Sequence, residues 1–271
     1  MPHLETPRGR VHYLEEGAPD GPPVVMVHGS CGGARQWSRL ARTLAERFRV
    51  IRLDLPGMGE SYEMPLEHVW TPEEDAAALG ALMDALGEPI RFVGHSAGCP
   101  FTWPALAARP ERVASLAMFE PVFFRQIEDA PENAFPTGTA EGYVARVDAG
   151  DIEGALAFFV DRWAGREGAW TLLPEPVREM MRKGAPRLRH EWASGLAEGF
   201  LPDDPARLTR ELAQTPTLLV QGAETVPAAA LVCDRLAALR PGTARFAVPG
   251  AGHMAPFTHA DAVAAPLAAH L

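Results

Sequence analysis

Short apolar segments that alternate with stretches of helical periodicity constrain the fold of this chain most strongly. The segment PPVVMVHG at 22–29 holds a fully apolar run bounded by proline and glycine. The next segment, 34–48, repeats its apolar residues at helical spacing. A strand without polar alternation is typical of a parallel sheet that is covered on both faces. The pattern therefore predicts an α/β domain with right-handed crossovers.

The same alternation recurs along most of the sequence. We expect further strands at 12–16, 49–55, 90–95, 113–119, 216–222 and 244–250, and helices at 72–86, 96–110, 227–239 and at the end of the chain. The alternation breaks between Pro121 and about Thr215, where helix-forming and aromatic residues replace strands. We therefore predict one α/β core domain, formed by 1–121 and 211–271, with a helical insertion at 122–210.

The composition limits the class of protein and its partners. The chain has 271 residues, of which 47% are hydrophobic and 22% are charged, and its formal net charge is −10. These fractions suit a globular protein with a sizeable core, and they exclude disordered, coiled-coil and fibrous chains. Because the basic residues form no run, we expect no nucleic-acid partner.

The cysteines and the apolar runs indicate the cellular compartment in which we expect the protein. Cys31, Cys99 and Cys233 share no close spacing, which fits neither a disulfide framework nor a zinc site of the CxxC type. The N-terminal segment MPHLETPRGRVHYLEEG lacks the apolar stretch of a leader peptide, and no apolar run is long enough to span a bilayer. From these features we expect a soluble, cytoplasmic protein without a membrane partner.

The sequence Gly94-His95-Ser96-Ala97-Gly98 lies between an apolar strand and a predicted helix. In this context G-x-S-x-G is typical of a nucleophile elbow, a tight turn that presents a strained serine. The flanking glycines keep neighbouring backbone from clashing. The helix behind the serine offers free N–H groups and its positive dipole end to a developing oxyanion. Taken alone, so short a motif also fits a tight turn with an incidental serine.

Three further motifs accompany this one in a fixed order. They are HGSCGG at 28–33, DLPGMGES at 54–61 and GAGH at 250–253. Together the four motifs resemble those of the α/β-hydrolase family, and the resemblance spans nearly the whole chain. It implies a mostly parallel central sheet flanked by helices, and it implies that the insertion is a helical cap over an active site.

The resemblance also implies roles for individual residues. Ser96 matches the family's nucleophile and His253 its general base, while the backbone N–H groups of Ser30 and Ala97 match its oxyanion hole. The roles of Ser96 and His253 agree with the chemistry of their side chains. Serine is a poor nucleophile until a base removes its proton, and histidine can do so near neutral pH. His259 is a rival base, but it falls in the predicted terminal helix.

The acid partner of the histidine is where the sequence departs from the family's commonest pattern. Most members carry Asp three residues beyond the glycine of the PTLLVQG strand, and here that position is Thr225. Glu224 is one residue early. Glu120 directly follows the strand at 113–119, at the sheet edge where Ser96 should also lie. Some family members place a catalytic acid at that strand end. We therefore predict Glu120 as the acid, with Glu224 as the alternative.

Other residues near the motifs are expected to have structural roles or to line the pocket. Asp54 should fix a turn beside the site, and His28 should orient the loop that follows it. The candidates for contact with substrate are Cys31, Phe123, Trp163 and Trp192.

These features predict a serine hydrolase that cleaves a carboxylic ester, lactone or thioester through an acyl-enzyme with a Ser-His-Glu triad. No metal and no cofactor are implied, and the expected partner is a small, largely apolar acyl compound. Two alternatives stay open on the sequence. The same site could hydrolyse C–C bonds or perform cofactor-free perhydrolysis, or the chain could be a ligand-binding or receptor protein on a hydrolase scaffold.

Overall fold

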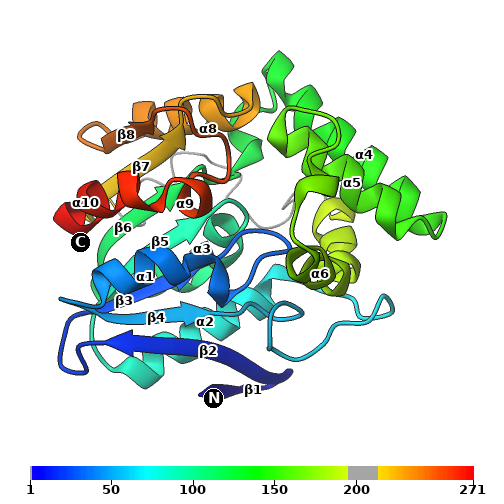
Figure 1. The fold of residues 1–271 in the computed structure, drawn as a ribbon. Coiled ribbons are helices and arrows are strands. Elements are labelled where there is room, and N and C mark those ends of the chain that lie inside the picture. The colour runs from blue at the N-terminus through cyan, green and yellow to red at the C-terminus, as the bar shows by residue number, and fades with distance from the viewer. Residues whose placement is uncertain (1, 195–212) are drawn as a thin grey trace.

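The computed structural model describes residues 2–194 and 213–271, and its elements are labelled as in Figure 1. The strands are β1 (His3–Thr6), β2 (Gly9–Gly17), β3 (Pro23–Val27), β4 (Arg49–Leu53), β5 (Ile90–His95), β6 (Val113–Phe119), β7 (Thr217–Gly222) and β8 (Ala244–Val248). The α-helices are α1 (Ser38–Leu44), α2 (Pro72–Leu86), α3 (Gly98–Ala107), α4 (Ala134–Asp148), α5 (Ile152–Ala164), α6 (Glu175–Ala193), α8 (Pro227–Leu239), α9 (Ala255–Thr258) and α10 (Ala260–His270).

The eight strands form one sheet in the order β1-β2-β4-β3-β5-β6-β7-β8. The first two strands pair antiparallel to each other, and β2 pairs antiparallel to β4. All later pairs are parallel. Crossover helices between parallel strands must cover the faces of the sheet, and Figure 1 shows helices on both of them. The predicted fold class, a mostly parallel α/β sheet flanked by helices, is confirmed.

Strand β3 shows how the apolar runs build two cores. All five of its residues are buried. Because successive side chains point to opposite faces, Val25 and Val27 join the cluster formed with α2, α3 and α8, while Val24 and Met26 join the cluster formed with α1 and α10. A strand buried on both faces has no solvent side, which explains why its sequence lacks polar alternation.

Most predicted elements are confirmed with small shifts at their ends. Helix α2 covers the predicted 72–86, and β5 and β6 cover the predicted 90–95 and 113–119. The helix expected at 34–48 is shorter, because a 3-10 turn at Ala34–Trp37 precedes α1 and the helix ends at Leu44. Strand β1 was not expected from the sequence, and it pairs only with β2 at the edge of the sheet.

Between β6 and β7 the described chain is helical, as the break in the alternation predicts. Helices α4, α5 and α6 gather beside one end of the sheet in Figure 1. The division into a core and a cap at 122–210 stays a prediction, and its second boundary lies outside the described residues. None of the described helices is both long and apolar enough to cross a membrane.

The junction of β3 and α3 requires glycine. A Cβ on Gly98 would lie 2.3 Å from the carbonyl oxygen of His28, whereas a Cβ on Gly138, inside α4, would have Arg162 as its nearest neighbour at 3.6 Å. Gly98→Ala should therefore lower the free energy of unfolding by about 1–3 kcal/mol through overpacking. Gly138→Ala should raise it by about 0.5–1 kcal/mol through helix propensity. Urea titration followed by circular dichroism measures both, and an equal effect of the two variants would contradict the packing argument.

Candidate active site

Ser96 lies on the tight turn between β5 and α3. Its φ of 52° is in the left-handed region, which only a sharp turn imposes on a serine. The glycines of the motif make this turn possible, because a Cβ on Gly94 would lie 2.6 Å from Cys99 Sγ and one on Gly98 would meet the end of β3. The Ser96 N–H donates to the carbonyl of Phe119 at 2.9 Å, which ties the turn to the end of β6.

The structure brings His253 and Glu120 to this serine. His253 Nε2 lies 3.0 Å from Ser96 Oγ, and His253 Nδ1 lies 2.7 Å from Glu120 Oε2. A carboxylate accepts from Nδ1–H, so in this tautomer Nε2 is free to accept the serine proton. The three side chains are buried, with residue exposures of 6% for Ser96, 1% for Glu120 and 6% for His253.

Glu120 is held by two further donors. The Gly222 N–H donates to Oε1 at 2.7 Å, and the Thr225 hydroxyl donates to Oε2 at 2.5 Å. Thr225 occupies the position where the α/β-hydrolase resemblance leads one to expect Asp, and here it supports the carboxyl group instead. Glu224, the alternative acid, has an exposed side chain. The geometry therefore joins Glu120, and not Glu224, to the imidazole.

His95 fixes the backbone of the histidine loop. Its Nε2 donates to the carbonyl of His253 at 3.0 Å, and its Nδ1 accepts from Gln36 Nε2 at 3.0 Å. Burial lowers the pKa of His95 well below its usual value, and the nearby His253 lowers it further, so this ring stays neutral. No local pattern predicts this role of Gln36, because its partner lies 59 positions away in the chain.

Ser30 and Ala97 belong to the two segments that meet at Ser96, the 28–33 loop and the start of α3. Gly29 passes so close to the turn that a Cβ on it would lie 3.0 Å from Ser96 Cβ. Ala97 directly precedes α3. Within the described part of the chain, the backbone N–H groups of Ser30 and Ala97 donate to no protein acceptor. Two free donors beside a serine can bind a developing negative charge on a substrate oxygen.

His28 holds the 28–33 loop against the loop that follows β4. Its Nδ1 donates to the carbonyl of Gly29 at 2.7 Å, and its Nε2 accepts from the Leu55 N–H at 3.1 Å. Burial lowers the pKa of His28, which keeps the ring neutral and able to make both bonds. Asp54 fixes the neighbouring turn by accepting from the N–H groups of Ala34 and Glu60.

The four predicted substrate contacts lie in different places. The ring of Trp163, from α5, lies 4.0 Å from the ring of His253, measured between centroids. Trp192, from α6, packs 6.4 Å from Phe124 in the same aromatic group. Phe123 packs against Trp103 at 5.6 Å in the core. Cys31 is buried in the 28–33 loop.

The rival base lies apart from this arrangement. His259 sits between α9 and α10, and its Nδ1 hydrogen-bonds the Thr258 hydroxyl at 2.8 Å. Among residues 2–194 and 213–271, no group of three His, Cys, Asp or Glu side chains is arranged to hold a metal ion.

Comparison with known proteins points to one family. A family model described as the alpha/beta hydrolase fold matches residues 22–260. The chain is 37% identical over 111 residues to Lipase LipV of Mycobacterium tuberculosis, and the match covers 40% of this chain and 41% of that protein. The match thus spans about two fifths of that curated relative.

Two solved structures match over nearly the full length. A thermophilic esterase from Thermogutta terrifontis has a TM-score of 0.75 and 25% identity, and the match covers 98% of this chain and 96% of that one. An alpha/beta hydrolase from Sphaerobacter thermophilus has a TM-score of 0.69 and 24% identity, with 99% of each chain covered.

The three cysteines should be inert toward thiol reagents in the folded protein. Burial raises the pKa of Cys31, Cys99 and Cys233 above the usual value, so below that raised pKa each thiol stays protonated and is a poor nucleophile. We expect iodoacetamide at pH 8 to leave the native protein unmodified and to add three groups after unfolding in guanidinium. Intact mass measures this. Rapid single modification of the native protein at Cys31 would contradict it.

Proposed function

The chain belongs to the alpha/beta hydrolase fold family, and from this premise we propose that it is a serine hydrolase that cleaves a carboxylic ester, lactone or thioester through an acyl-enzyme. One observation carries the proposal. Ser96, His253 and Glu120 form an unbroken line of hydrogen bonds at 3.0 and 2.7 Å, beside the free N–H groups of Ser30 and Ala97. A nucleophile, a base, an orienting acid and two oxyanion donors are what acyl transfer requires.

In the first half of the reaction, Ser96 Oγ attacks the carbonyl carbon while its proton moves to His253 Nε2. Glu120 stabilises the imidazolium that forms, and it keeps the ring in the tautomer that accepts at Nε2. The N–H groups of Ser30 and Ala97 bind the oxyanion. Collapse of the tetrahedral intermediate then breaks the ester bond, and His253 gives its proton to the leaving alkoxide or thiolate.

In the second half, water replaces the alcohol. His253 removes a proton from the water, whose oxygen attacks the acyl carbon, and Ser96 leaves with that proton. The carboxylic acid is released and the free enzyme is restored. The serine proton leaves with the alcohol or thiol and a proton from water takes its place on Ser96, so this cycle needs no further reactant than water.

The helices between β6 and β7 support two further parts of the proposal, a cap over the site and an apolar acyl group in the substrate. We propose that 122–210 forms this cap. Trp163 lies against the imidazole, and Phe159 and Trp192 pack near it, so an acyl group beside His253 would meet aromatic surface. Such a lining favours a small to medium, largely apolar acyl group. The names lipase and esterase on the relatives agree with an ester as substrate.

The first test is hydrolysis of p-nitrophenyl esters of increasing acyl length. The wild type should turn over at least the short esters, and Ser96→Ala should lower kcat by about 10⁴- to 10⁶-fold because the nucleophile is lost. Ser38→Ala, which changes a half-buried serine at the start of α1, is the matched control and should retain full activity. Equal, negligible rates in the wild type and in Ser96→Ala would contradict ester hydrolysis.

The second test separates the two candidate acids. Glu120→Gln keeps the shape of the side chain but removes the charge that stabilises the imidazolium, so kcat should fall about 10³- to 10⁴-fold. Glu224→Gln alters an exposed side chain and should leave kcat unchanged. The same ester assay measures both variants. The opposite pattern would exclude Glu120 as the acid.

A further inference from the structure

Helix α6 lies directly against the 28–33 loop. Gly184, Arg187 and Glu191 are spaced three and four residues apart, so they share one face of the helix. A Cβ on Gly184 would lie 2.8 Å from Met58 Sδ and 3.4 Å from Cys31 Sγ. The glycine therefore lets the helix approach the loop closely, which brings the two charged side chains of this face into the core.

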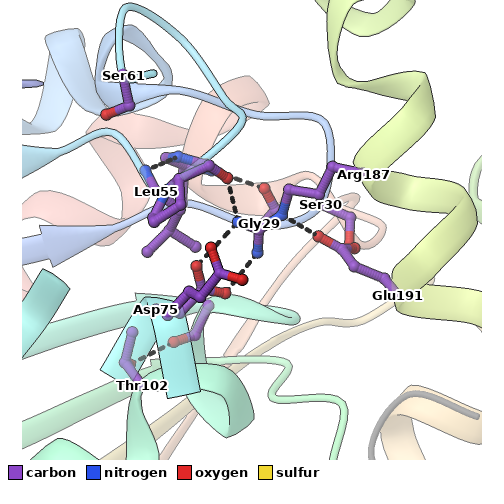
Figure 2. Close-up of polar contacts among 12 residues, drawn as sticks. Gly29, Ser30, Leu55, Ser61, Asp75, Thr102, Arg187 and Glu191 are labelled. Atoms are coloured by element: carbon purple, nitrogen blue, oxygen red, sulfur yellow. Dashed lines mark hydrogen bonds and ion pairs between the residues drawn. The ribbon is translucent and has the colours of Figure 1, made fainter. Parts of the chain in front are cut away.

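Glu191 links this helix to Ser30. The Ser30 hydroxyl donates to Glu191 Oε2 at 2.5 Å, and Arg187 Nε donates to Glu191 Oε1 at 2.8 Å. The side chains of Arg187 and Glu191 are each 1% exposed. Figure 2 shows both of them extending from α6 toward Ser30. The contact joins a residue of α6 to a loop 161 positions earlier in the chain.

Arg187 anchors Glu191 to the rest of the core. Its guanidinium donates to both oxygens of Asp75, at 2.8 and 2.5 Å, and also to the carbonyl of Pro56 (Figure 2). It also lies 4.9 Å from the centre of the Trp70 ring. The two-oxygen pairing fixes the plane of the guanidinium, so the direction of its Nε–H, and with it Glu191, is fixed as well.

Asp75, Arg187 and Glu191 form a buried ion cluster. Removing these charges from water costs free energy, so packing alone does not explain the cluster. It holds one cation and two carboxyl groups, all nearly inaccessible to water, and hydrophobic side chains of the same volume commonly hold a helix in place at lower cost. Its contact with the 28–33 loop is therefore informative. Glu191 accepts from Arg187 with one oxygen and from the Ser30 hydroxyl with the other, and Ser30 is one of the two oxyanion donors proposed above.

We propose that Glu191 is a positioning residue for the hydrolytic reaction. By accepting the Ser30 hydroxyl it turns that side chain toward α6, and so holds the Ser30 backbone with its N–H directed at the oxyanion. Arg187 fixes Glu191 in this task. The inference rests on the proposed function, and it makes the strength of the oxyanion contact depend on the position of α6.

A double-mutant cycle on the most reactive p-nitrophenyl ester tests this. Ser30→Ala leaves the buried cluster intact and removes only the hydroxyl, and Glu191→Gln is its partner. Complete loss of one oxyanion donor costs about 10²- to 10³-fold, and a displaced donor should cost less. We expect each variant to lower kcat about 10-fold with little change in KM. The double variant should be no slower than either single one, and Ser30→Thr, which keeps a hydroxyl, should restore kcat.

Two kinetic results would overturn the proposal. One is an unchanged kcat in Ser30→Ala. The other is a loss in the double variant that equals the product of the single losses, because Glu191 would then act independently of Ser30. A merely structural contact would lower the melting temperature of the variants without this pattern in kcat.

Hydrogen exchange decides the inference even where no ester is turned over. The Gly32 N–H donates to the carbonyl of Gly29 at 3.0 Å and so reports on the order of the loop. It should exchange faster in Ser30→Ala and in Glu191→Gln than in the wild type, and at the wild-type rate in Ser38→Ala. Unchanged exchange in the first two variants would overturn the positioning role. Absent ester turnover in the wild type with faster exchange in the variants would count against the proposed function only.

Discussion

The site depends on the hydrogen-bond ladder of the parallel strands, which continues for one residue past their ends. The Ser96 N–H donates to Phe119 O at 2.9 Å, and the Glu120 N–H donates to Val220 O at 3.0 Å. Ser96 and Glu120 are thus held by the strand hydrogen bonds rather than by a free loop. Because all these strands are parallel, their carboxyl ends meet at one edge, and His253 arrives there from the end of β8.

Backbone strain is concentrated at this edge. In the described residues the non-glycine residues with positive φ are Cys31, Ser96 and Glu120, at 53°, 52° and 42°. Each such conformation costs on the order of 1–2 kcal/mol for a residue with a Cβ. The cost is offset by fixed contacts, such as the Gly222 N–H on Glu120 and the strand ladder on Ser96. The strained residues are thus the serine itself and two others, Cys31 and Glu120, and the fold keeps them at a cost in stability.

The sequence predicts those parts of the structure that depend on residues close together in the chain. The apolar runs predicted the strands, and the preference for Glu120 over Glu224 followed from its place directly after β6. Contacts between distant side chains left no such signal. The sequence indicates Thr225 only as a position where Asp is missing, while the structure shows its hydroxyl bonded to Glu120. The sequence also does not predict the hydrogen bond between Ser30 and Glu191, because no periodicity links residues 161 positions apart. The edge strand β1 was missed because a short, half-exposed strand has no apolar run.

The buried charges on α6 connect this helix to the 28–33 loop at the end of β3. A carboxyl group near an oxyanion site opposes the negative charge that develops there, so Glu191 would hinder the reaction if it stood alone. Arg187 lies between its two carboxyl partners and balances much of that charge, and its bond to the Pro56 carbonyl fastens it to the core side. The helix can therefore use a strong, directional acceptor to orient Ser30 while the guanidinium limits the electrostatic penalty. An apolar contact at the same place would hold α6 equally well but could not orient a hydroxyl, which is the physical reason for a charged contact here.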